Sequence, residues 1–164
     1  MTVTGKQSLV RLVTIAGGVI LADQLTKALI MAQLPLYERM EVTSFFNITH
    51  VLNPGGAFGM FATQSPVVRR FFFLFVSSLV SLGLLWFYGQ VAREHRFLSM
   101  GLAAIFGGAV GNLIDRFRFG QVVDFLDFYI GTWHWPAFNV ADSAICIGMA
   151  ILFYHVILNK IPEL

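Results

Sequence analysis

The sequence predicts an α-helical integral membrane protein with four transmembrane helices, a small β-rich segment outside the cytoplasm and an aromatic connection at the membrane surface. Hydrophobic residues make up 57% of the 164 residues and charged residues 12%, about half the share of roughly 25% found in soluble domains. Four apolar stretches are each long enough for a helix to cross the hydrocarbon core. The connection before the last stretch is rich in Trp, Tyr and Phe, which are typical of the membrane–water interface.

We expect one membrane domain that covers residues 1–164. Residues 71–92 carry no formal charge and predict the clearest span. The first span has a basic start and an apolar run, as a secretory signal peptide has. Ile20 and Ala22 make a poor small-residue cleavage site, however, and apolar sequence resumes at Ala28, so we expect a retained helix. The predicted helices cover about 9–34, 67–92, 97–116 and 139–159, with connections outside the cytoplasm at about 35–66 and 117–138.

The first long connection is too rich in Pro and Gly for a helix. Its residues 42–52 are rich in Val, Ile, Thr and Phe, and they predict one or two short strands that end at a turn over 53–56. An even number of spans places both termini on one side of the membrane. The basic start of the first span favours the cytoplasm for them. The net charge of +2 gives no sign of nucleic-acid binding, and the single cysteine, Cys146, excludes an internal disulfide.

Ionisable residues inside a span are costly, and each is therefore a candidate for function. Asp23 and Lys27 stand four residues apart with the acid first, the favourable order for an ion pair within a helix. Such a pair either neutralises the first span for insertion or supports a functional site. The sequence leaves both interpretations open.

The third span ends with small residues followed by polar ones. Glycines at 107 and 111 permit close approach to a neighbouring helix. One interpretation is a packing face that ends in an Asp–Arg pair. The other is the wall of a polar cavity, which an amide, an acid and a guanidinium on one face favour. This face holds Gly108, Asn112, Asp115 and Arg116.

Three aspartates lie where the aromatic connection meets the membrane. Asp124 stands alone in an apolar segment, and Asp127, one helical turn away, competes with it for any single-carboxylate role. Asp142 opens the last span at the N3 position of a capping box, with Asn139 as the N-cap. Two carboxylates brought together share one proton and can activate water against an amide. The helix end favours ionised Asp142, so we expect Asp124 to hold the proton and Asn139→Ala to weaken the field at Asp142 without touching either acid.

No metal or cofactor is expected. The four histidines are scattered, and neither HExxH, a Cys/His cluster nor a GxSxG motif is present. Two other classes stay open on the residues alone. A small proton-coupled transporter or channel would use intramembrane carboxylates, but it would show repeated halves, which the sequence lacks. A non-catalytic lipid-binding scaffold gives no reason for the polar residues within the spans.

Five segments together make the chain similar to the lipoprotein signal peptidases (signal peptidase II), a family of bacterial membrane aspartic peptidases. Their order and spacing fit the family over nearly the whole chain. One departure is Gly56, where the family usually has alanine; it loosens a turn and leaves Asn53 in place. The matching segments are Asp23–Lys27, Asn53–Phe58, Gly107–Arg116, Val122–Phe125 and Phe138–Ser143.

The resemblance implies roles for the polar residues. Asp124 and Asp142 would form the catalytic dyad, and Asp127 would only add polarity at the interface. Roles in lining or supporting the site would fall to Asn53, Asn112, Arg116, Asn139, Asp115, Asp23, Lys27 and Gly108.

The resemblance also implies a substrate, a prolipoprotein cleaved just before a diacylglyceryl-modified cysteine. The enzyme would lie in the bacterial cytoplasmic membrane, in contact with phospholipid. Both termini would be cytoplasmic, and the active site would face the outer leaflet. We expect it to work as a monomer, with no metal and no nucleic-acid partner.

Overall fold

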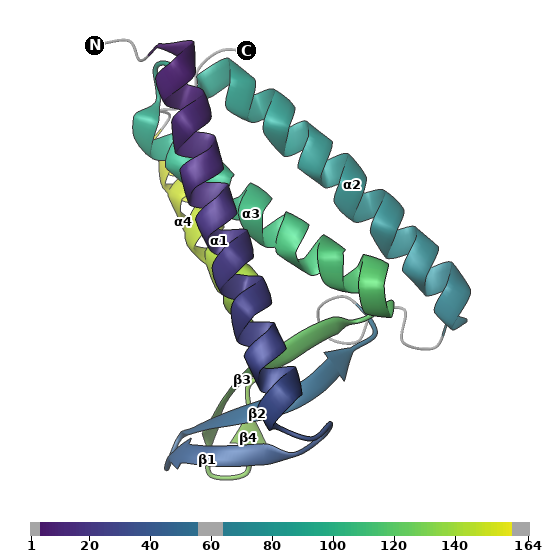
Figure 1. Cartoon of the computed structure of the whole chain (residues 1–164). Coiled ribbons are helices and arrows are strands. Elements are labelled where there is room, and N and C mark those ends of the chain that lie inside the picture. Colours follow the sequence, from purple (N-terminus) through teal and green to yellow (C-terminus); the bar gives the residue numbers. More distant parts are fainter. Residues whose placement is uncertain (1–3, 56–63, 159–164) are drawn as a thin grey trace.

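The computed structural model describes residues 4–55 and 64–158, and it forms a helical bundle with a small sheet at one end (Figure 1). Each of four helices is long and apolar enough to cross a membrane, which confirms the predicted class. The first residues of α1 and the last of α4 lie at the same end of the bundle, opposite the sheet. The helices are α1 (Gly5–Gln33), α2 (Pro66–Val91), α3 (Arg96–Phe119) and α4 (Val140–Ile157).

Helix α3 is the centre of the bundle, because it packs against each of the other three helices. Small residues make this possible. A Cβ atom added at Gly107 would lie 2.9 Å from the Cα of Ala16 in α1, and one added at Gly108 would overlap the carbonyl oxygen of Ala141 in α4. The predicted close approach at the glycines of α3 is therefore confirmed.

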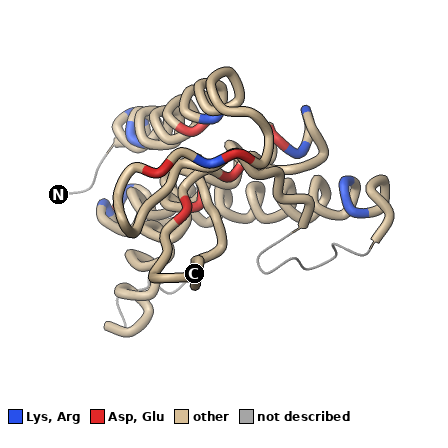
Figure 2. Tube along the Cα trace, turned by 90° about the horizontal axis from the view of Figure 1, so that it is seen from below, with Lys and Arg blue, Asp and Glu red and all other residues tan. Residues whose placement is uncertain are grey.

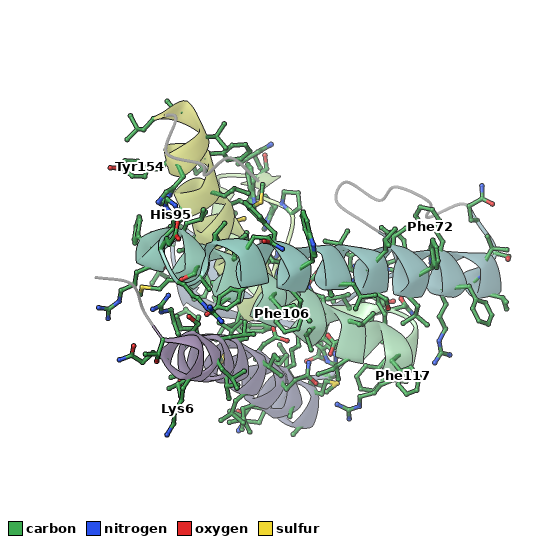
Figure 3. The ribbon with its side chains drawn as sticks, turned by 90° about the horizontal axis from the view of Figure 1, so that it is seen from above. Lys6, Phe72, His95, Phe106, Phe117 and Tyr154 are labelled. Carbon is green, nitrogen blue, oxygen red and sulfur yellow. The ribbon has the colours of Figure 1, made fainter. Side chains whose placement is uncertain are left out.

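The outer faces of α1 and α2 are apolar and exposed. Val13 and Leu21 on α1, and Phe71 and Phe75 on α2, each expose 60% or more of their surface. Figure 3 shows Phe72 projecting outward from α2, and acidic and basic residues are sparse along the helices in Figure 2. Continuous apolar faces of this kind match a lipid environment.

The sheet is antiparallel, with its strands in the order β1-β2-β3-β4. One or two strands were expected at residues 42–52, and the structure has two, of which the first begins three residues earlier, at Arg39. The turn that follows them is described only as far as Gly55, so Gly56 lies outside the described residues. The strands are β1 (Arg39–Thr43), β2 (Phe46–Asn53), β3 (Val122–Ile130) and β4 (Trp133–His134).

The second connection differs from the expectation, because β3 and β4 occupy much of it. The expected helical-turn relation between Asp124 and Asp127 is wrong. Both lie on β3, where Asp124 pairs with Val51 and Asp127 with Asn47 of β2. Side chains alternate along a strand, so residues three apart point to opposite faces. The β-branched and aromatic residues around Asp124 favour a strand, and β2 supplies the partner.

Candidate active site

Asp124 lies in the middle of β3 and is 2% exposed. Its Oδ2 accepts a hydrogen bond from Asn53 Nδ2 at 3.0 Å, and its Oδ1 accepts one from Asn139 Nδ2 at 2.7 Å. Burial raises the pKa of Asp124 to about 7, and the nearby charge of Asp142 acts in the same direction. The two amide donors oppose the rise in pKa, since they favour the ionised form. Asp124 is thus placed to hold a proton near neutral pH.

Asp142 is held at the first turn of α4 by a capping box. Its backbone N–H donates to Asn139 Oδ1 at 2.9 Å, and its Oδ2 accepts from the backbone N–H of Asn139 at 3.3 Å. The expected capping role is therefore confirmed. The other oxygen, Oδ1, accepts from Asn112 Nδ2 at 2.8 Å, so the same carboxylate also belongs to a side-chain network.

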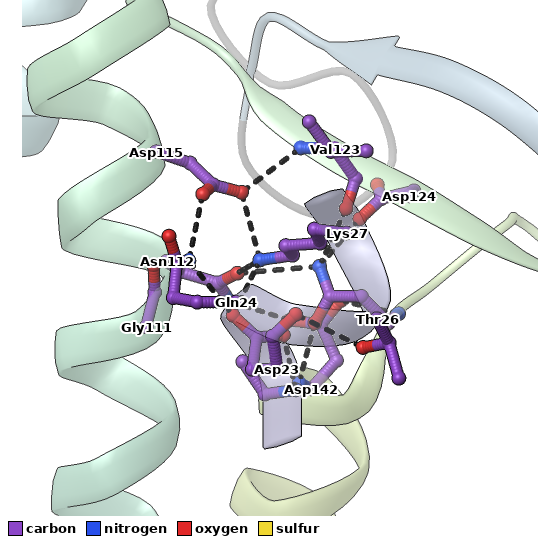
Figure 4. Close-up of polar contacts among 12 residues, drawn as sticks. Asp23, Gln24, Thr26, Lys27, Gly111, Asn112, Asp115, Val123, Asp124 and Asp142 are labelled. Atoms are coloured by element: carbon purple, nitrogen blue, oxygen red, sulfur yellow. Dashed lines mark hydrogen bonds and ion pairs between the residues drawn. The ribbon is translucent and has the colours of Figure 1, made fainter. Parts of the chain in front are cut away.

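Amide groups join the two aspartates. Asn139 Nδ2, which donates to Asp124, also lies 3.2 Å from Asn112 Oδ1. Lys27 Nζ donates to this same oxygen at 3.1 Å. An ammonium group can only donate, so it fixes the orientation of the Asn112 amide and directs Nδ2 to Asp142. Figure 4 shows Lys27, Asn112, Asp124 and Asp142 gathered at the meeting point of α1, α3, β3 and α4.

Lys27 sits between two buried carboxylates. Its Nζ lies 2.8 Å from Asp23 Oδ2 and 2.7 Å from Asp115 Oδ2, and all three side chains are at most 1% exposed. The predicted i, i+4 pair is confirmed, and the second acid makes it a three-membered cluster. Asp115 pairs with this lysine, which favours the cavity interpretation of the α3 face over a terminal Asp–Arg pair.

The carboxylates of this cluster also bind the backbone next to each expected catalytic acid. Asp23 Oδ1 accepts from the backbone N–H of Ala141, directly before Asp142, at 2.9 Å. Asp115 Oδ2 accepts from the backbone N–H of Val123, directly before Asp124, at 3.1 Å. The cluster therefore positions both β3 and the start of α4.

Gln24 belongs to the same network and was not among the expected site residues. Its Nε2 donates to Asp115 Oδ1 at 2.9 Å and to the carbonyl oxygen of Gly111 at 3.2 Å. Its place beside Asp23, within a matching segment, was the available signal. An amide gives no charge or motif of its own, and sequence reasoning passed over it.

A cavity of about 290 Å³ opens beside the two aspartates. Asn53, Asn112 and Arg116 line it together with them. Asn139 and Gly108 are not among the lining residues; Asn139 binds Asp124, and Gly108 packs against Ala141 of α4. Sequence reasoning missed several apolar lining residues. Two of them, on α4, follow Asp142 by three and four positions, a helical spacing that would have identified them. These missed residues include Trp135, Phe138, Ile145 and Cys146.

Arg116 projects from α3 into the same cavity. Its Nη1 donates to the carbonyl oxygen of Asn112 at 3.4 Å, and its guanidinium carbon lies 5.1 Å from the ring centroid of Phe73 on α2. A guanidinium over an aromatic face is attracted by the ring. These contacts hold a positive charge next to the carboxylates without pairing it directly to either.

Asp127 lies apart from this cavity. Its Oδ2 accepts from Asn47 Nδ2 at 2.9 Å, and its Oδ1 lies 2.8 Å from His134 Nδ1. It is satisfied by its own neighbours on the sheet. Among the described residues, no group of three or more His, Cys, Asp or Glu side chains is arranged to hold a metal ion.

Comparison with solved structures places the chain among membrane enzymes. Two structures titled as bacterial membrane enzymes are similar to it over nearly their whole length. The first has a TM-score of 0.79 at 31% identity, and the match covers 94% of this chain and 95% of the matched chain. The second has a TM-score of 0.82 at 30% identity, and the match covers 99% of this chain and 96% of the matched chain.

Sequence comparison then shows the family. Residues 15–158 match the model of signal peptidase (SPase) II. A lipoprotein signal peptidase of Desulforapulum autotrophicum is 65% identical over 159 residues, which cover 96% of this chain and 98% of that protein. A lipoprotein signal peptidase of Syntrophus aciditrophicus is 45% identical over 154 residues, which cover 93% of this chain and 95% of that protein. The chain belongs to the signal peptidase II family, an aspartic peptidase family, and it is therefore an enzyme rather than a transporter.

Proposed function

We propose that this protein removes the signal peptide of diacylglyceryl-modified prolipoproteins by cleaving just before the lipidated cysteine, with Asp124 and Asp142 as the catalytic dyad. Membership of the signal peptidase II family supports the removal of signal peptides from prolipoproteins. The assignment of the dyad rests on one observation. Two carboxylates from different elements, β3 and α4, line one cavity, and Asn139 contacts both: its Nδ2 donates to Asp124 Oδ1, and its backbone N–H donates to Asp142 Oδ2.

In this mechanism Asp142 acts as the general base and Asp124 as the general acid. Asp142, as the carboxylate, takes a proton from water, and the water oxygen adds to the carbonyl carbon of the scissile amide. Asp124, whose raised pKa of about 7 favours the protonated form, donates its proton to the carbonyl oxygen. When the intermediate collapses, Asp124 recovers that proton and the leaving nitrogen takes the proton from Asp142. The dyad thus returns to its starting state without a cofactor.

The walls of the cavity suit a lipid-anchored peptide. Phe138 and Ile145 offer apolar contacts, and Arg116 offers a guanidinium that can donate to a peptide carbonyl. The cavity lies near the sheet end of the bundle, where a scissile bond beside a lipid anchor would meet the membrane surface. We place this end at the outer leaflet, with both termini in the cytoplasm. One chain supplies all these groups, in keeping with a functional monomer.

Cleavage of a diacylglyceryl-modified prolipoprotein peptide by the purified protein tests the proposal, with the unlipidated peptide as control. We expect cleavage of the lipidated peptide alone. Asp124→Asn and Asp142→Asn should each reduce the rate below about 1% of wild type, because an amide cannot take or give the proton. Asp127→Asn, the matched acid on the other face of β3, should keep most of the activity. Substantial activity in either dyad variant, or loss of activity only in Asp127→Asn, would remove that assignment.

A further inference from the structure

A second cleft lies between α1 and α3, at the end of the bundle opposite the sheet. It measures about 410 Å³ and has one basic and one apolar part. Arg11 of α1 and Arg96 of α3 supply the basic part. Its lining residues are Gln7, Val10, Arg11, Thr14, Ile15, Arg96 and Met100, and no carboxylate is among them.

Arg11 is held in place by the protein. Its Nη1 donates to the carbonyl oxygen of Ala92 at 3.0 Å and to Ser99 Oγ at 2.5 Å. Ser99 is fully buried, so the guanidinium is anchored against α2 and α3 and its remaining N–H groups are left for another acceptor. Both acceptors are uncharged, and the positive charge therefore stays uncompensated.

Arg96 adds a second unpaired charge. Its guanidinium has no hydrogen-bond or ion-pair partner among the residues that the structure describes. It stands at the first position of α3, whose N-cap residue, His95, makes no side-chain capping bond. The free N–H groups and the positive end of the helix dipole add to the charge there. Figure 3 shows this end of the molecule, with Lys6 pointing outward from α1.

Two cations that share a cleft repel each other unless an anion lies between them. The apolar part of the cleft restricts what the anion can be. Val10 is 57% exposed and Met100 is 37% exposed, and both lie on helices that are long and apolar enough to span a membrane. A ligand that fits carries a negative group at one end and an apolar body at the other. In a membrane, a phospholipid has this chemistry, and basic clefts between membrane helices are known binding places for anionic headgroups.

We propose that the cleft between α1 and α3 binds the phosphate of an anionic phospholipid, with Arg11 and Arg96 as the phosphate ligands and the acyl chains along Val10 and Met100. The site is separate from the aspartates, and it fixes the depth of the bundle in the membrane from the end opposite the sheet. Its test does not depend on peptidase activity.

Native mass spectrometry of the delipidated protein in a neutral detergent tests the proposal, with phosphatidylglycerol and phosphatidylcholine added separately. We expect one tightly retained phosphatidylglycerol and much weaker retention of phosphatidylcholine. Arg96→Gln removes no side-chain hydrogen bond or ion pair within the described residues and should weaken phosphatidylglycerol binding about fivefold. The double variant, with Arg11→Gln added, should weaken it about 30-fold. Arg39→Gln, on exposed strand β1, is the matched control and should bind as wild type does.

Three results would overturn the proposal. Equal phosphatidylglycerol binding by wild type and both variants would show that the arginines are not ligands. A loss of binding in Arg39→Gln as large as that in Arg96→Gln would show an effect of net charge alone. Displacement of the lipid by a large excess of inorganic phosphate would show a free-anion site rather than a lipid site. Peptide cleavage by Arg96→Gln in detergent, expected at the wild-type rate, verifies that this variant is folded.

Discussion

We expect Asn53→Ala to change the proton affinity of Asp124, one of the two proposed catalytic acids, and to leave that of Asp142 unchanged. Asn53 Nδ2 donates to Asp124 Oδ2 at 3.0 Å, and this bond lowers the pKa of Asp124 against the larger upward effect of burial. No side-chain hydrogen bond joins Asn53 to Asp142 in the described part of the chain. Removing the amide therefore removes a stabilising donor from the ionised form of Asp124 only, and the pKa of Asp124 should rise further above about 7.

The size of the rise follows from the strength of the lost bond. A hydrogen bond to a charged group contributes about 1.5–3 kcal/mol, and about 1.4 kcal/mol corresponds to one pKa unit. Water entering the space left by the amide will replace part of the bond, so we expect a rise of about one unit. In the proposed mechanism Asp124 must be protonated when substrate binds. The basic limb of the pH profile of kcat/KM should accordingly move about one unit to higher pH.

The assay is cleavage of a lipidated peptide by Asn53→Ala between about pH 5 and pH 10, with detergent and lipid held constant. Asn47→Ala is the matched control, because Asn47 lies on the same strand and donates to Asp127 Oδ2 at 2.9 Å. The control should keep the wild-type basic limb. A basic limb that stays in place or moves to lower pH in an active Asn53→Ala variant would refute the assignment of the shared proton to Asp124.

Three further predictions rest on packing, charge and metal chemistry. Gly108→Ala should reduce kcat/KM at least about tenfold, because the added Cβ would overlap the Ala141 carbonyl and displace the start of α4. Gly83→Ala is the control, because an added Cβ there meets open space on α2, and it should cleave at the wild-type rate. Equal rates in the two variants would refute the packing argument. Lys27→Met should lower the free energy of unfolding in detergent by about 3–5 kcal/mol, because two buried carboxylates lose their cation; a change below about 1 kcal/mol would contradict this. Chelators should leave the cleavage rate unchanged, whereas inhibition reversed by added zinc would contradict an aspartic mechanism.

Local signals in the sequence predicted the helices and the cap of α4 correctly. Long apolar runs are sufficient to indicate spans, because a membrane helix satisfies all its backbone hydrogen bonds within one segment. The capping box at Asn139 and Asp142 needs only residues three positions apart. The Asp23–Lys27 pair is equally local. Interactions within one or two helical turns are therefore readable from the order of the residues.

Contacts between elements were not readable in this way. The sequence suggested an ion pair in the first span. It could not show that Asp115 completes the cluster, or that Asp115 and Asp23 bind the backbone N–H groups directly before Asp124 and Asp142. Those bonds join residues that are far apart in the chain. The strand at Asp124 was missed for the same reason, since a strand depends on the partner that β2 provides.

Asn139 shows how such a contact changes a prediction. From the sequence, Asn139→Ala is expected to weaken only the field at Asp142, and a weaker field there would move the acidic limb of the kcat profile to higher pH. In the structure the Asn139 side chain also donates to Asp124 Oδ1 at 2.7 Å, so the same change removes a donor that lowers the pKa of Asp124.

We therefore expect both limbs of the Asn139→Ala profile to move to higher pH, whereas Asn53→Ala moves the basic limb alone. Loss of the cap reduces the preference for charge at Asp142 and shifts the acidic limb. Loss of the donor favours the protonated form of Asp124 and shifts the basic limb. The comparison needs the pH dependence of kcat for both variants, in the same detergent. If Asn139→Ala moved the acidic limb alone, the hydrogen bond from Asn139 to Asp124 would have no effect on the pKa of Asp124. Asn139 would then only hold the two proposed catalytic acids in position.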